Sequence, residues 1–536
     1  MSNCLSIAVF FLGCFSLYAQ PDSLAPVMSV MDTNNIKLTT MANGDMGWNY
    51  TNMTTRAPKF EDTGFLYASG LWIASKDTTN GLYLAANSYN NTGGMDFWAG
   101  PIADYYDTDY DTTYNRSWTI GMEEIDYHRA HYFEDSYEMP EVIAHWPGNG
   151  SISNGESDQL APYYDDNSNG IYEPESGDFP LIRGDKAVFV IYNDDRNVHT
   201  NTGGIKVGAE VHMMLYAYNS EDTAIYNAVF VHYEVFNRGD NDFNEMYAAV
   251  WNDWDLGGNY DDIIACDKDR NVSFVYNQFN FDKSIFGTDS ILVSQGFGNN
   301  PPAAGLISLN EDIYTHTYWQ NNSNAMSGNL QEAKHYINHL NGYWTDGSPI
   351  PSNDGSLLFN DISVEDTLDL DLVHNWGERD RRSLHNVLIP SFLSGESFCL
   401  DFAYVFAENT NYSAKKNAVL LMDYVDDIQV FYDAHFANCT DHSADFDNLS
   451  TEEFVEELEV DLLKGAGSNV WVLSGRGNMP KAYTVHLVNT VGQELYQTYW
   501  DTESDLEMKM DSFAKGVYFI RIRSGNESRT MSFIKE

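Results

Sequence analysis

Oxygen-bearing side chains alternate along one short segment in the first third of the chain. Asp165, Asn167 and Asn169 occupy every second position, a glycine is the sixth residue, and the seventh, Ile171, offers a backbone carbonyl. A calcium-binding loop requires this order, because Ca2+ takes its ligands from carboxylate, amide and carbonyl oxygens. The twelfth position is Ser176, so a nearby acidic residue has to supply the missing carboxylate. The predicted calcium ligands are Asp165, Asn167, Asn169, Ile171, Glu173 and Asp178.

Pro174 directly follows Glu173 and disfavours a helix at the end of the loop. The pattern therefore predicts a calcium loop inside β structure rather than one half of an EF-hand. A plain turn rich in Asn and Asp is the alternative, since these residues also favour turns without a bound ion.

A second acidic segment packs five carboxylates into fifteen residues between two predicted strands: Asp253, Asp255, Asp261, Asp262 and Asp267. Without a counter-ion these groups repel one another. Ca2+ bound by Asp253, Asp255, Asp261 and Asp262 is one interpretation, and a solvated acidic loop is the other. The acidic run at 104–111 presents the same choice.

Two histidine–glutamate pairs mirror each other on the strands of a predicted hairpin, Glu210 with His212 and His232 with Glu234. Residues two apart share a face, so a turn centred near Asp222 is expected to place His212 opposite His232. Two imidazoles and two carboxylates would suit a transition metal or acid–base chemistry. Polar residues on the outer face of a hairpin explain the same pattern without a function.

The motifs of several enzyme classes are absent from the sequence. It contains no G-x-S-x-G, no H-E-x-x-H, no phosphate-binding loop and no dinucleotide fingerprint. His128, His131 and Glu134 can align along a helix, but no second cluster completes a metal site. Tryptophans can floor a sugar groove, yet core packing is their commoner role. The sequence therefore names no reaction.

These side chains have to be positioned by β structure. Short apolar and aromatic runs separated by clusters of Asn, Asp, Gly and Ser fill residues 60–410, a spacing typical of β-sandwiches and similar sheets in which helix is scarce. Among the predicted strands are 81–86, 186–192, 208–218 and 224–236, the last two forming the hairpin. A helix capped by Ser413 is predicted to cover one sheet face with a stripe of Val419, Met422, Val425, Ile428 and Phe431.

The last 70 residues form a separate predicted unit. An acidic, weakly periodic linker at 440–468 leads into it. Strand-like pieces then recur every eight to twelve residues, at 483–488, 494–499, 506–510, 516–522 and 529–534. That spacing predicts a small β-sandwich.

Three pieces of this tail, 489–493, 513–519 and 531–536, resemble the C-terminal sorting domain of type IX secretion cargo in Bacteroidota. The residues that carry the resemblance are Gly492, Gly516, Val517, Tyr518 and Lys535. The Pro-Asn-Pro entry that is usual in the family is absent from this chain. The resemblance implies that the type IX machinery recognises the tail and cleaves it while the cargo is released or joined to an anionic surface polysaccharide. An ordinary sandwich domain at the end of the chain is the alternative.

The body also resembles a widespread group of long secreted Bacteroidota proteins that carry this tail and have no assigned activity. The matching pieces are 69–73, 96–101, 146–147, 160–165, 177–180, 184–185, 342–347 and 380–382. The group brings no catalytic role to the body.

The charge balance excludes some classes of binding partner. With 79 acidic and 29 basic residues, the chain has a formal charge of −50, which repels nucleic acid and anionic lipid. No segment after the N-terminus reaches the ~18 uninterrupted apolar residues of a membrane helix. Nucleic acid is therefore excluded as a partner, and no transmembrane segment is expected.

The first 19 residues read as a secretory signal cut after Ala19. A lipobox that makes Cys14 a lipid anchor is the alternative. After removal of the signal, Cys266, Cys399 and Cys439 remain. They permit one disulfide, but none has a metal-type spacing, and buried unpaired cysteines are the favoured state.

The prediction is thus a mostly β protein: a signal peptide at 1–19, a β-rich body at 20–439 in one or two subdomains, the linker, and an Ig-like sorting sandwich at 469–536. The expected function is that of a secreted or cell-surface protein, structural or adhesive, without catalysis and stabilised by Ca2+. The alternative is a secreted glycan hydrolase that uses a carboxylate pair.

Overall fold

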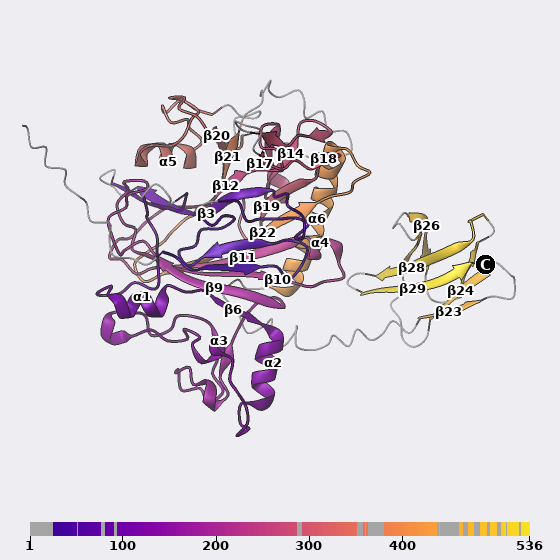
Figure 1. Cartoon of the computed structure of the whole chain (residues 1–536), viewed down its shortest axis with the longest axis horizontal. Helices are drawn as coiled ribbons and strands as arrows, with labels where there is room; N and C mark the ends of the chain where they lie inside the picture. Colours follow the sequence, from indigo (N-terminus) through magenta and orange to yellow (C-terminus); the bar gives the residue numbers. More distant parts are fainter. Residues whose placement is uncertain are drawn as a thin grey trace, which may run out of the picture. The chain divides into compact units, whose positions relative to one another are not determined.

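The computed structural model describes most of the body and the strands of the tail (Figure 1). The described residues are 25–436, except 51, 77–80, 90–93, 287–291, 351–356, 360 and 363–379, then residue 439, and 460–464, 470–475, 483–489, 494–500, 505–510, 512–524 and 527–535. The chain divides into two compact units, Met1–Phe446 and Asp447–Glu536. The predicted signal peptide lies outside the described residues.

The larger sheet of the body is antiparallel and runs in the order β13-β14-β19-β22-β11-β10-β9-β5, with β6 also paired to β9. Val, Ile, Phe and Tyr dominate its strands, and these residues favour the pleated, buried geometry of a central sheet. The strand bounds are β5 Trp98–Ala99, β6 Trp118–Gly121, β9 Lys186–Asn193, β10 Ala209–Ala217, β11 Ala228–Asn237, β13 Asp262–Asp267, β14 Val272–Asn277, β19 Ala303–Ser308 and β22 Ser397–Ala407.

The second sheet of the body runs in the order β20-β21-β12-β3-β4 and is also antiparallel. Its strands are β3 Leu66–Lys76, β4 Leu82–Ala86, β12 Met246–Trp254, β20 Thr315–Gln320 and β21 Arg381–Ile389. Alternation along β3 divides its side chains between two cores. Leu71 and Ile73 face the larger sheet, whereas Trp72 packs on the outer side against Trp319 and Tyr336. The two sheets therefore form a sandwich with a second aromatic core behind the smaller sheet.

Helix α6, Ala414–His435, covers the outer face of the larger sheet and contacts β22, β14 and β19. The Ser413 side chain accepts a hydrogen bond from the Lys416 backbone N–H, as the sequence predicted for its cap. Met422, Val425 and Ile428 are buried in the predicted stripe. The predicted role of this helix is confirmed.

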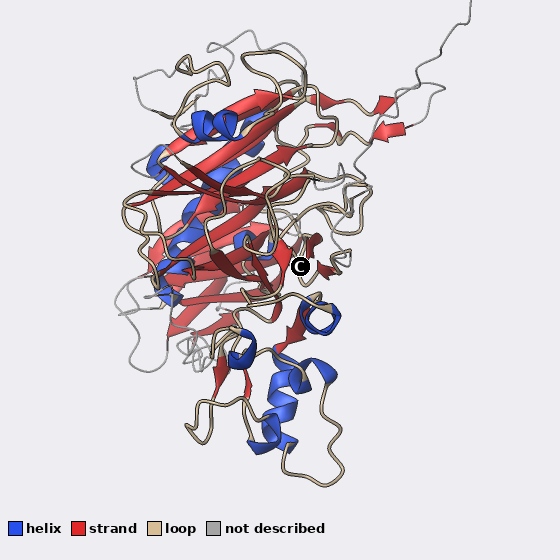
Figure 2. Ribbon diagram, turned by 90° about the vertical axis from the view of Figure 1, so that its left-hand side faces the viewer, coloured by secondary structure: helices blue, strands red, loops and turns tan. Residues whose placement is uncertain are grey.

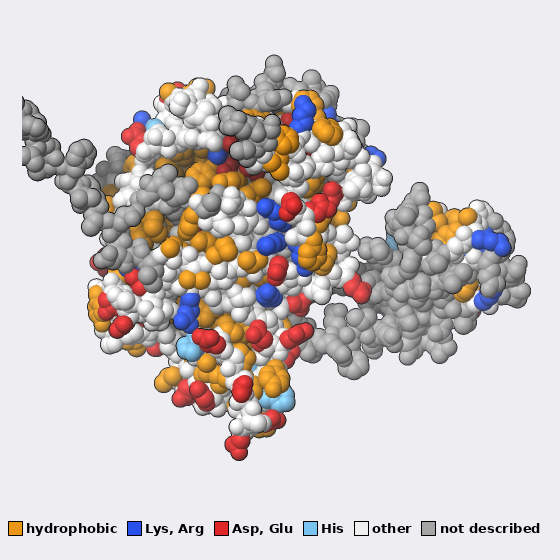
Figure 3. Space-filling model, in the orientation of Figure 1, with side chains coloured by type: hydrophobic (Ala, Val, Ile, Leu, Met, Phe, Trp, Pro, Cys, Tyr) orange, Lys and Arg blue, Asp and Glu red, His pale blue; other side chains and the backbone are white. Residues whose placement is uncertain are grey.

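Strands fill most of the body, and the helices lie along one side and at its lower end in Figure 2. The remaining helices of the described part are α1 Thr108–Tyr114, α2 Met122–His131, α3 Glu141–Ala144, α4 Thr223–Tyr226 and α5 Ala333–Leu340, with 3-10 turns η1 Ile152–Asn154, η2 Pro174–Ser176 and η3 Lys268–Arg270. Small two-stranded ribbons pair β1 Met28–Met31 with β2 Leu38–Met41, β7 Tyr163–Tyr164 with β8 Phe179–Pro180, β15 Phe281–Asp282 with β18 Gly298–Asn299, and β16 Ile285–Phe286 with β17 Leu292–Ser294. Mostly β structure is thus confirmed for the body, and on the face shown in Figure 3 its hydrophobic, basic and acidic side chains are interspersed.

The predicted hairpin is present as β10 and β11, but its register differs from the prediction. His212 faces Glu234, and His232 faces Met214, so the two histidines are not opposite each other. The physical reason is the connection between the strands, which contains the single helical turn α4, capped by Asp222. This turn moves the centre of the hairpin by one residue. The predicted register is therefore wrong. His212 bonds Glu210 at 3.1 Å, whereas His232 bonds Asp401 at 2.9 Å, so the two pairs have different partners.

The cysteines also correct a prediction. Cys399 in β22 and Cys439 beyond α6 form a disulfide, and Cys266 is the free, buried cysteine. The helix folds back over the strand from which it came, which brings together two residues 40 apart in sequence.

The tail consists of two facing sheets with a shared core. One has the order β23-β24-β27 and the other β26-β25-β28-β29. Their bounds are β23 Val460–Lys464, β24 Val470–Gly475, β25 Tyr483–Asn489, β26 Glu494–Trp500, β27 Leu506–Lys509, β28 Gly516–Ser524 and β29 Glu527–Lys535. Leu473 and Met508 from the first sheet pack with Leu487 and Ile520 from the second. The strands predicted from residue 483 onward are present, and β23 adds a strand inside the range that was predicted as linker.

Candidate cation site

Three aspartates meet where two neighbouring strands of the smaller sheet end. Asp253 lies in β12, and Asp255 follows two residues later. Asp380 immediately precedes β21, whose Arg382 pairs with Asp253 across the two strands. Antiparallel pairing therefore brings together residues more than 120 positions apart in the sequence.

One carboxylate oxygen of each of Asp253, Asp255 and Asp380 lies within 4.8 Å of those of the other two. Asp253 is 2% exposed and Asp255 is 8% exposed. The Asp380 side chain retains 20% exposure and forms the outer side of the group. The cluster is thus a nearly closed group of acidic oxygens that water reaches from the side of Asp380.

Arg382 and Tyr89 bind part of this acidic surface. The Arg382 guanidinium donates to Asp253 Oδ2 at 3.1 Å and to Asp380 Oδ1 at 2.6 Å. The Tyr89 hydroxyl donates to Asp253 Oδ2 at 2.6 Å. Asp253 Oδ1 is buried and has no hydrogen-bond partner among the described residues. A buried acceptor without a partner costs about 1–3 kcal/mol, more if it is charged.

The ionisation of the cluster reflects this shortage of positive charge. Burial raises the pKa of Asp253 to about 7, with a further contribution from the charge of Asp380. Burial, together with the charges of Asp253 and Asp380, raises the pKa of Asp255 well above its usual value. Three carboxylates and one guanidinium carry a net charge of −2 when all are ionised, so a divalent cation would neutralise the group.

The other two aspartates of the predicted acidic site lie elsewhere. Asp261 lines a surface pocket. Asp262 is 1% exposed, and its carboxylate accepts hydrogen bonds from the Leu256 backbone N–H at 3.1 Å and from the Asn277 amide at 3.3 Å. Neither residue belongs to the group that Asp253 and Asp255 form with Asp380.

The predicted calcium loop is an exposed turn in which the side chains bind the backbone. Asp165 accepts from the backbone N–H groups of Asn169 and Gly170, and the Asn169 amide donates to Glu173 at 2.6 Å. Asp178 is buried and accepts from the backbone N–H of Glu173 at 2.7 Å. Only a 3-10 turn follows, as expected from Pro174. The oxygens of Asn167 and Asn169 bind backbone N–H groups of the same loop, and Ile171 is exposed.

A second group that includes a histidine has no capacity for a metal. His232, Asp401 and Cys439 lie close together, but the Cys439 sulfur is in the disulfide. The Asp401 carboxylate already accepts from Arg183, His232 and Tyr432. This group is a buried hydrogen-bond network that fastens α6 to the sheet.

Histidines on α2 serve different roles from a metal site. His128 is fully buried, and its ring bonds the Tyr137 hydroxyl at 2.8 Å and the Asp178 carbonyl at 3.0 Å. His131 is half-buried and pairs with Glu134 at 3.0 Å. The helix is thus solvated on one side and packed against the loop that ends at Asp178.

Two of the sorting residues of the tail, Tyr518 and Lys535, bind backbone carbonyls just before β28. Lys535, in the last strand, pairs with Gly516 and donates its ammonium group to the carbonyls of Met510, at 2.6 Å, and Phe513. The Tyr518 hydroxyl donates to the Ala514 carbonyl at 2.7 Å. Val517 pairs with Ile534, and Gly492 lies outside the described residues. The side chains of Lys535 and Tyr518 therefore bind the carbonyls of Met510, Phe513 and Ala514, which precede β28.

Sequence reasoning missed Asp380, Arg382 and Tyr89 as members of the acidic cluster. Asp380 and Arg382 were noted only within a matched segment, and Tyr89 carried no signal at all. A pairing of β12 with β21 would have been needed to find them, and no periodicity along the chain specifies which distant strand is the neighbour.

Residues 469–536 match the family model described as the secretion system C-terminal sorting domain. The tail is therefore a type IX secretion sorting signal, and the chain is cargo of that system in Bacteroidota. It is a secreted or cell-surface protein. Among the described residues, no helix is both long and apolar enough to cross a membrane.

No curated protein matches the chain. Among solved structures, a polysaccharide lyase aligns with 60% of this chain and 34% of its own length, at 10% identity and a TM-score of 0.19. A biofilm-associated protein, its BSP domain, aligns with 95% of this chain and 80% of its own length, at 8% identity and a TM-score of 0.14. The chain thus spans about a third of the lyase, and neither similarity carries an argument about fold or function.

Proposed function

We propose that the body is a non-catalytic structural or adhesive module, exported by the type IX system and stabilised by Ca2+ bound to Asp253, Asp255 and Asp380. Two observations carry the proposal: three carboxylates converge, and Asp253 contributes a buried Oδ1 that has no hydrogen-bond partner among the described residues. Ca2+ binds oxygens at 2.3–2.6 Å, so ligands on opposite sides of one ion lie about 5 Å apart. The 4.8 Å limit of the cluster fits that geometry.

The arrangement favours an ion over a glycan hydrolase. A hydrolase needs two carboxylates about 5–9.5 Å apart with a sugar and often a water between them. Here Asp253 is 2% exposed, and Arg382 and Tyr89 occupy one of its oxygens. A sugar ring has no access to such a group, whereas a single desolvated ion does.

The loop that contains Asp165 is a second proposed Ca2+ site. Its alternating oxygens lie on an exposed turn, and Asp178 fixes the start and the end of the loop by accepting from Asp166 and Glu173. Bound Ca2+ would replace the hydrogen bonds that the side-chain oxygens now make with the backbone. The two sites are separable, because each can be removed by one substitution.

Thermal unfolding with and without a chelator tests the proposal. Free Ca2+ at about 100 times its Kd stabilises a folded protein by about 2.7 kcal/mol. We expect EGTA to lower the Tm of the wild type and of Asp240→Asn, an exposed control. Asp255→Asn and Asp380→Asn should remove the part of that shift due to the cluster, and Asp165→Ala the part due to the loop.

Equal chelator shifts in wild type, Asp255→Asn and Asp380→Asn would contradict the cluster site. Hydrolysis of a polysaccharide that both Asp253→Asn and Asp255→Asn abolish, with no chelator effect, would favour the hydrolase instead. For export, mass spectrometry of the mature termini in wild type and in a strain without type IX export is the measurement. An anionic surface polysaccharide joined to the new C-terminus indicates attachment, and a free C-terminus indicates release.

A further inference from the structure

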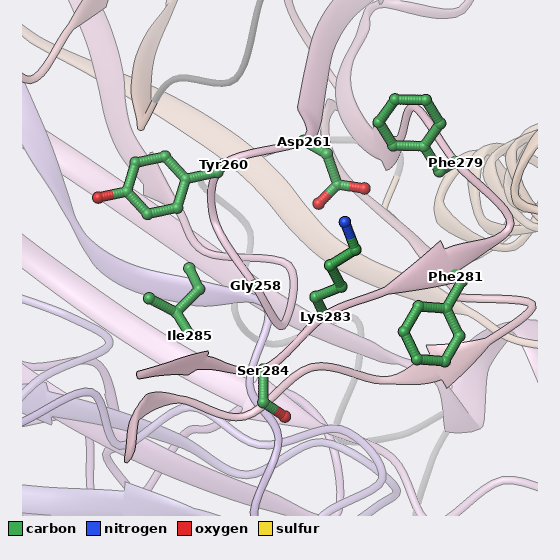
Figure 4. A pocket seen from close by; sticks show the side chains of 8 residues that line it. All are labelled: Gly258, Tyr260, Asp261, Phe279, Phe281, Lys283, Ser284 and Ile285. Carbon is green, nitrogen blue, oxygen red and sulfur yellow. The ribbon is translucent and has the colours of Figure 1, made fainter. Parts of the chain in front are cut away.

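An exposed aromatic pocket lies on the body, apart from the proposed calcium ligands. It has a volume of about 190 Å³ and is lined by Gly258, Tyr260, Asp261, Phe279, Phe281, Lys283, Ser284 and Ile285 (Figure 4). Phe279 and Phe281 are each 50% exposed, and Tyr260 is 47% exposed. An exposed cluster of large apolar side chains often marks a binding surface.

The segment around β15 builds the first wall. Phe279 lies in the bend that precedes β15, and Phe281 and Lys283 are two residues apart, so these two project from the same face. Asp282, between them, points the other way and is buried. The opposite wall is the loop that carries Tyr260 and Asp261, and Figure 4 shows the Lys283 ammonium group directed toward the Asp261 carboxylate.

Hydrogen bonds beneath the pocket hold its two walls at a fixed distance. The buried Asp282 carboxylate accepts from the backbone N–H of Phe297 at 2.7 Å and from that of Gly258 at 3.0 Å. A Cβ at Gly258 would lie 2.1 Å from the Lys283 carbonyl oxygen, so only glycine allows this approach. The pocket is therefore preformed, and binding needs no reordering of the backbone.

The lining suits a ring that is apolar on its face and polar on its rim. An ammonium group donates three hydrogen bonds and a carboxylate accepts about four, so Lys283 and Asp261 can bind ligand hydroxyls while they face each other. A purely apolar group would remove water from both charges and offer no replacement, at a cost of about 1–3 kcal/mol for each lost partner. A pyranose ring has C–H bonds on its face for the aromatic rings and hydroxyls on its rim for the charged pair.

Charge further restricts the ligand. Lys283 is the one cation in the lining, and Asp261 offsets it. The chain as a whole carries a formal charge of −50. An anionic sugar would thus meet long-range repulsion from the protein and no net positive charge in the lining. The volume lies below the ~300–1,000 Å³ of pockets for drug-sized ligands, which leaves room for one ring.

From this geometry we infer that the pocket between Tyr260 and Phe281 is a binding subsite for a single pyranose unit of a neutral polysaccharide. Phe281 and Phe279 contact the face of the ring, and Asp261 and Lys283 bind its hydroxyls. The inference does not depend on calcium at the acidic cluster, because none of the eight lining residues is a proposed ligand in the cluster of Asp253, Asp255 and Asp380.

Affinity electrophoresis of the full chain in native gels that contain starch, mixed-linkage glucan, xylan, galactomannan or alginate tests the inference. We expect at least one neutral polysaccharide to retard the wild type. Phe281→Ala and Lys283→Ala should weaken the apparent affinity at least about tenfold, and the double variant Phe279→Ala, Phe281→Ala should abolish retardation. Because both rings are half exposed, these variants should keep the wild-type Tm.

Phe133→Ala is the matched control, since this ring is 70% exposed and follows α2, at the end of the body away from β17 and β18 in Figure 1. It should be retarded like the wild type. Retardation by none of the neutral polysaccharides, or by alginate alone, would overturn the inference. Equal retardation of the wild type and the double variant would overturn it as well.

Discussion

Arg183 and Asp401 form an ion pair in the interior of the body, with 2.8 Å between Nη1 and Oδ1 and side chains that are 0% and 1% exposed. The remaining oxygen of Asp401 accepts from Tyr432 of α6 at 2.6 Å. Arg183 also donates to the carbonyl of Cys439 at 2.8 Å. One buried carboxylate thus links the sheet, the helix and the segment that carries the disulfide.

Removal of one partner of this pair should destabilise the body strongly. Arg183→Met leaves Asp401 buried without its cation, and an unpaired buried charge costs about 3–5 kcal/mol. Arg183 and His232 hold the pKa of Asp401 well below its usual range, so this contribution is present near neutral pH and is lost as the pH falls below about 4. Urea unfolding of the wild type and Arg183→Met at pH 7 measures the loss of stability. Lys186→Met, which removes an exposed pair with Asp32, should cost less than about 1 kcal/mol. Equal losses in the two variants would contradict the assignment.

Asp282 should make the body less stable as the pH rises from about 4 to 7. Burial, with the charge of Asp261, raises its pKa to about 7. Between pH 4 and pH 7 the folded protein therefore keeps a proton that the unfolded chain has released, and the free energy of unfolding falls with pH. Asp282→Asn removes this dependence. We expect the wild type to lose stability relative to the variant by a few kcal/mol over that range, at about 1.4 kcal/mol for each unit of pKa.

The effect of Asp282 has to be measured as the difference in the free energy of unfolding between the wild type and Asp282→Asn. Burial lowers the pKa values of His316, to about 4, and of His385, to about 3, which makes the folded state more stable as the pH rises to about 6.5. This opposite contribution is the same in wild type and in Asp282→Asn, so it cancels. Urea unfolding of both proteins at pH 4, 5, 6, 7 and 8 gives the difference. A difference that stays constant with pH would show that Asp282 ionises normally.

Local pattern was sufficient to predict which segments form strands, because alternation and turn residues act within a few positions. It also gave the cap and buried stripe of α6, from Ser413 to Ile428. The register of β10 and β11 was beyond this reasoning, since one helical turn in the connection moves every partner by two positions.

The acidic cluster shows the same limit more sharply. Asp253 and Asp255 stood out as neighbours in sequence, and the structure brings them together. Asp380 and Arg382 reach them only through the pairing of β12 with β21. Tyr89 lies in a segment that follows β4 and donates its hydroxyl to Asp253. Long-range pairing is set by the total burial of two sheets, and no single residue encodes it.

The disulfide between Cys399 and Cys439 should contribute about 4 kcal/mol to stability, because it closes a loop of 40 residues in the unfolded chain. Peptide mapping without reduction should recover these two cysteines in one linked pair. Cys266 is buried and should be alkylated only after unfolding. The double variant Cys399→Ser, Cys439→Ser should unfold at lower urea than Cys266→Ala. Alkylation of Cys399 in the unreduced, unfolded chain would contradict the pairing.

Lys535 should be the most sensitive lysine of the tail. Its side chain is 8% exposed, and its ammonium group donates to the carbonyls of Met510 and Phe513 in the turn that precedes β28. Lys535→Met keeps the apolar stem but leaves these carbonyls without their donor, at a cost of about 1–3 kcal/mol. Because residues 447–536 form a unit with its own core, unfolding of that fragment by urea measures the loss directly.

Lys509→Met, on the exposed side of β27, is the matched control and should change the stability of the fragment by less than about 0.5 kcal/mol. The contact of Lys535 with these carbonyls should also affect export, because the type IX machinery has to recognise a folded tail. We expect Lys535→Met to lower the amount of mature protein in the medium and on the cell surface, and Lys509→Met to leave it unchanged. If Lys535→Met destabilises the fragment while export stays at the wild-type level, the turn is a stabilising element only, and recognition depends on another surface of the sandwich.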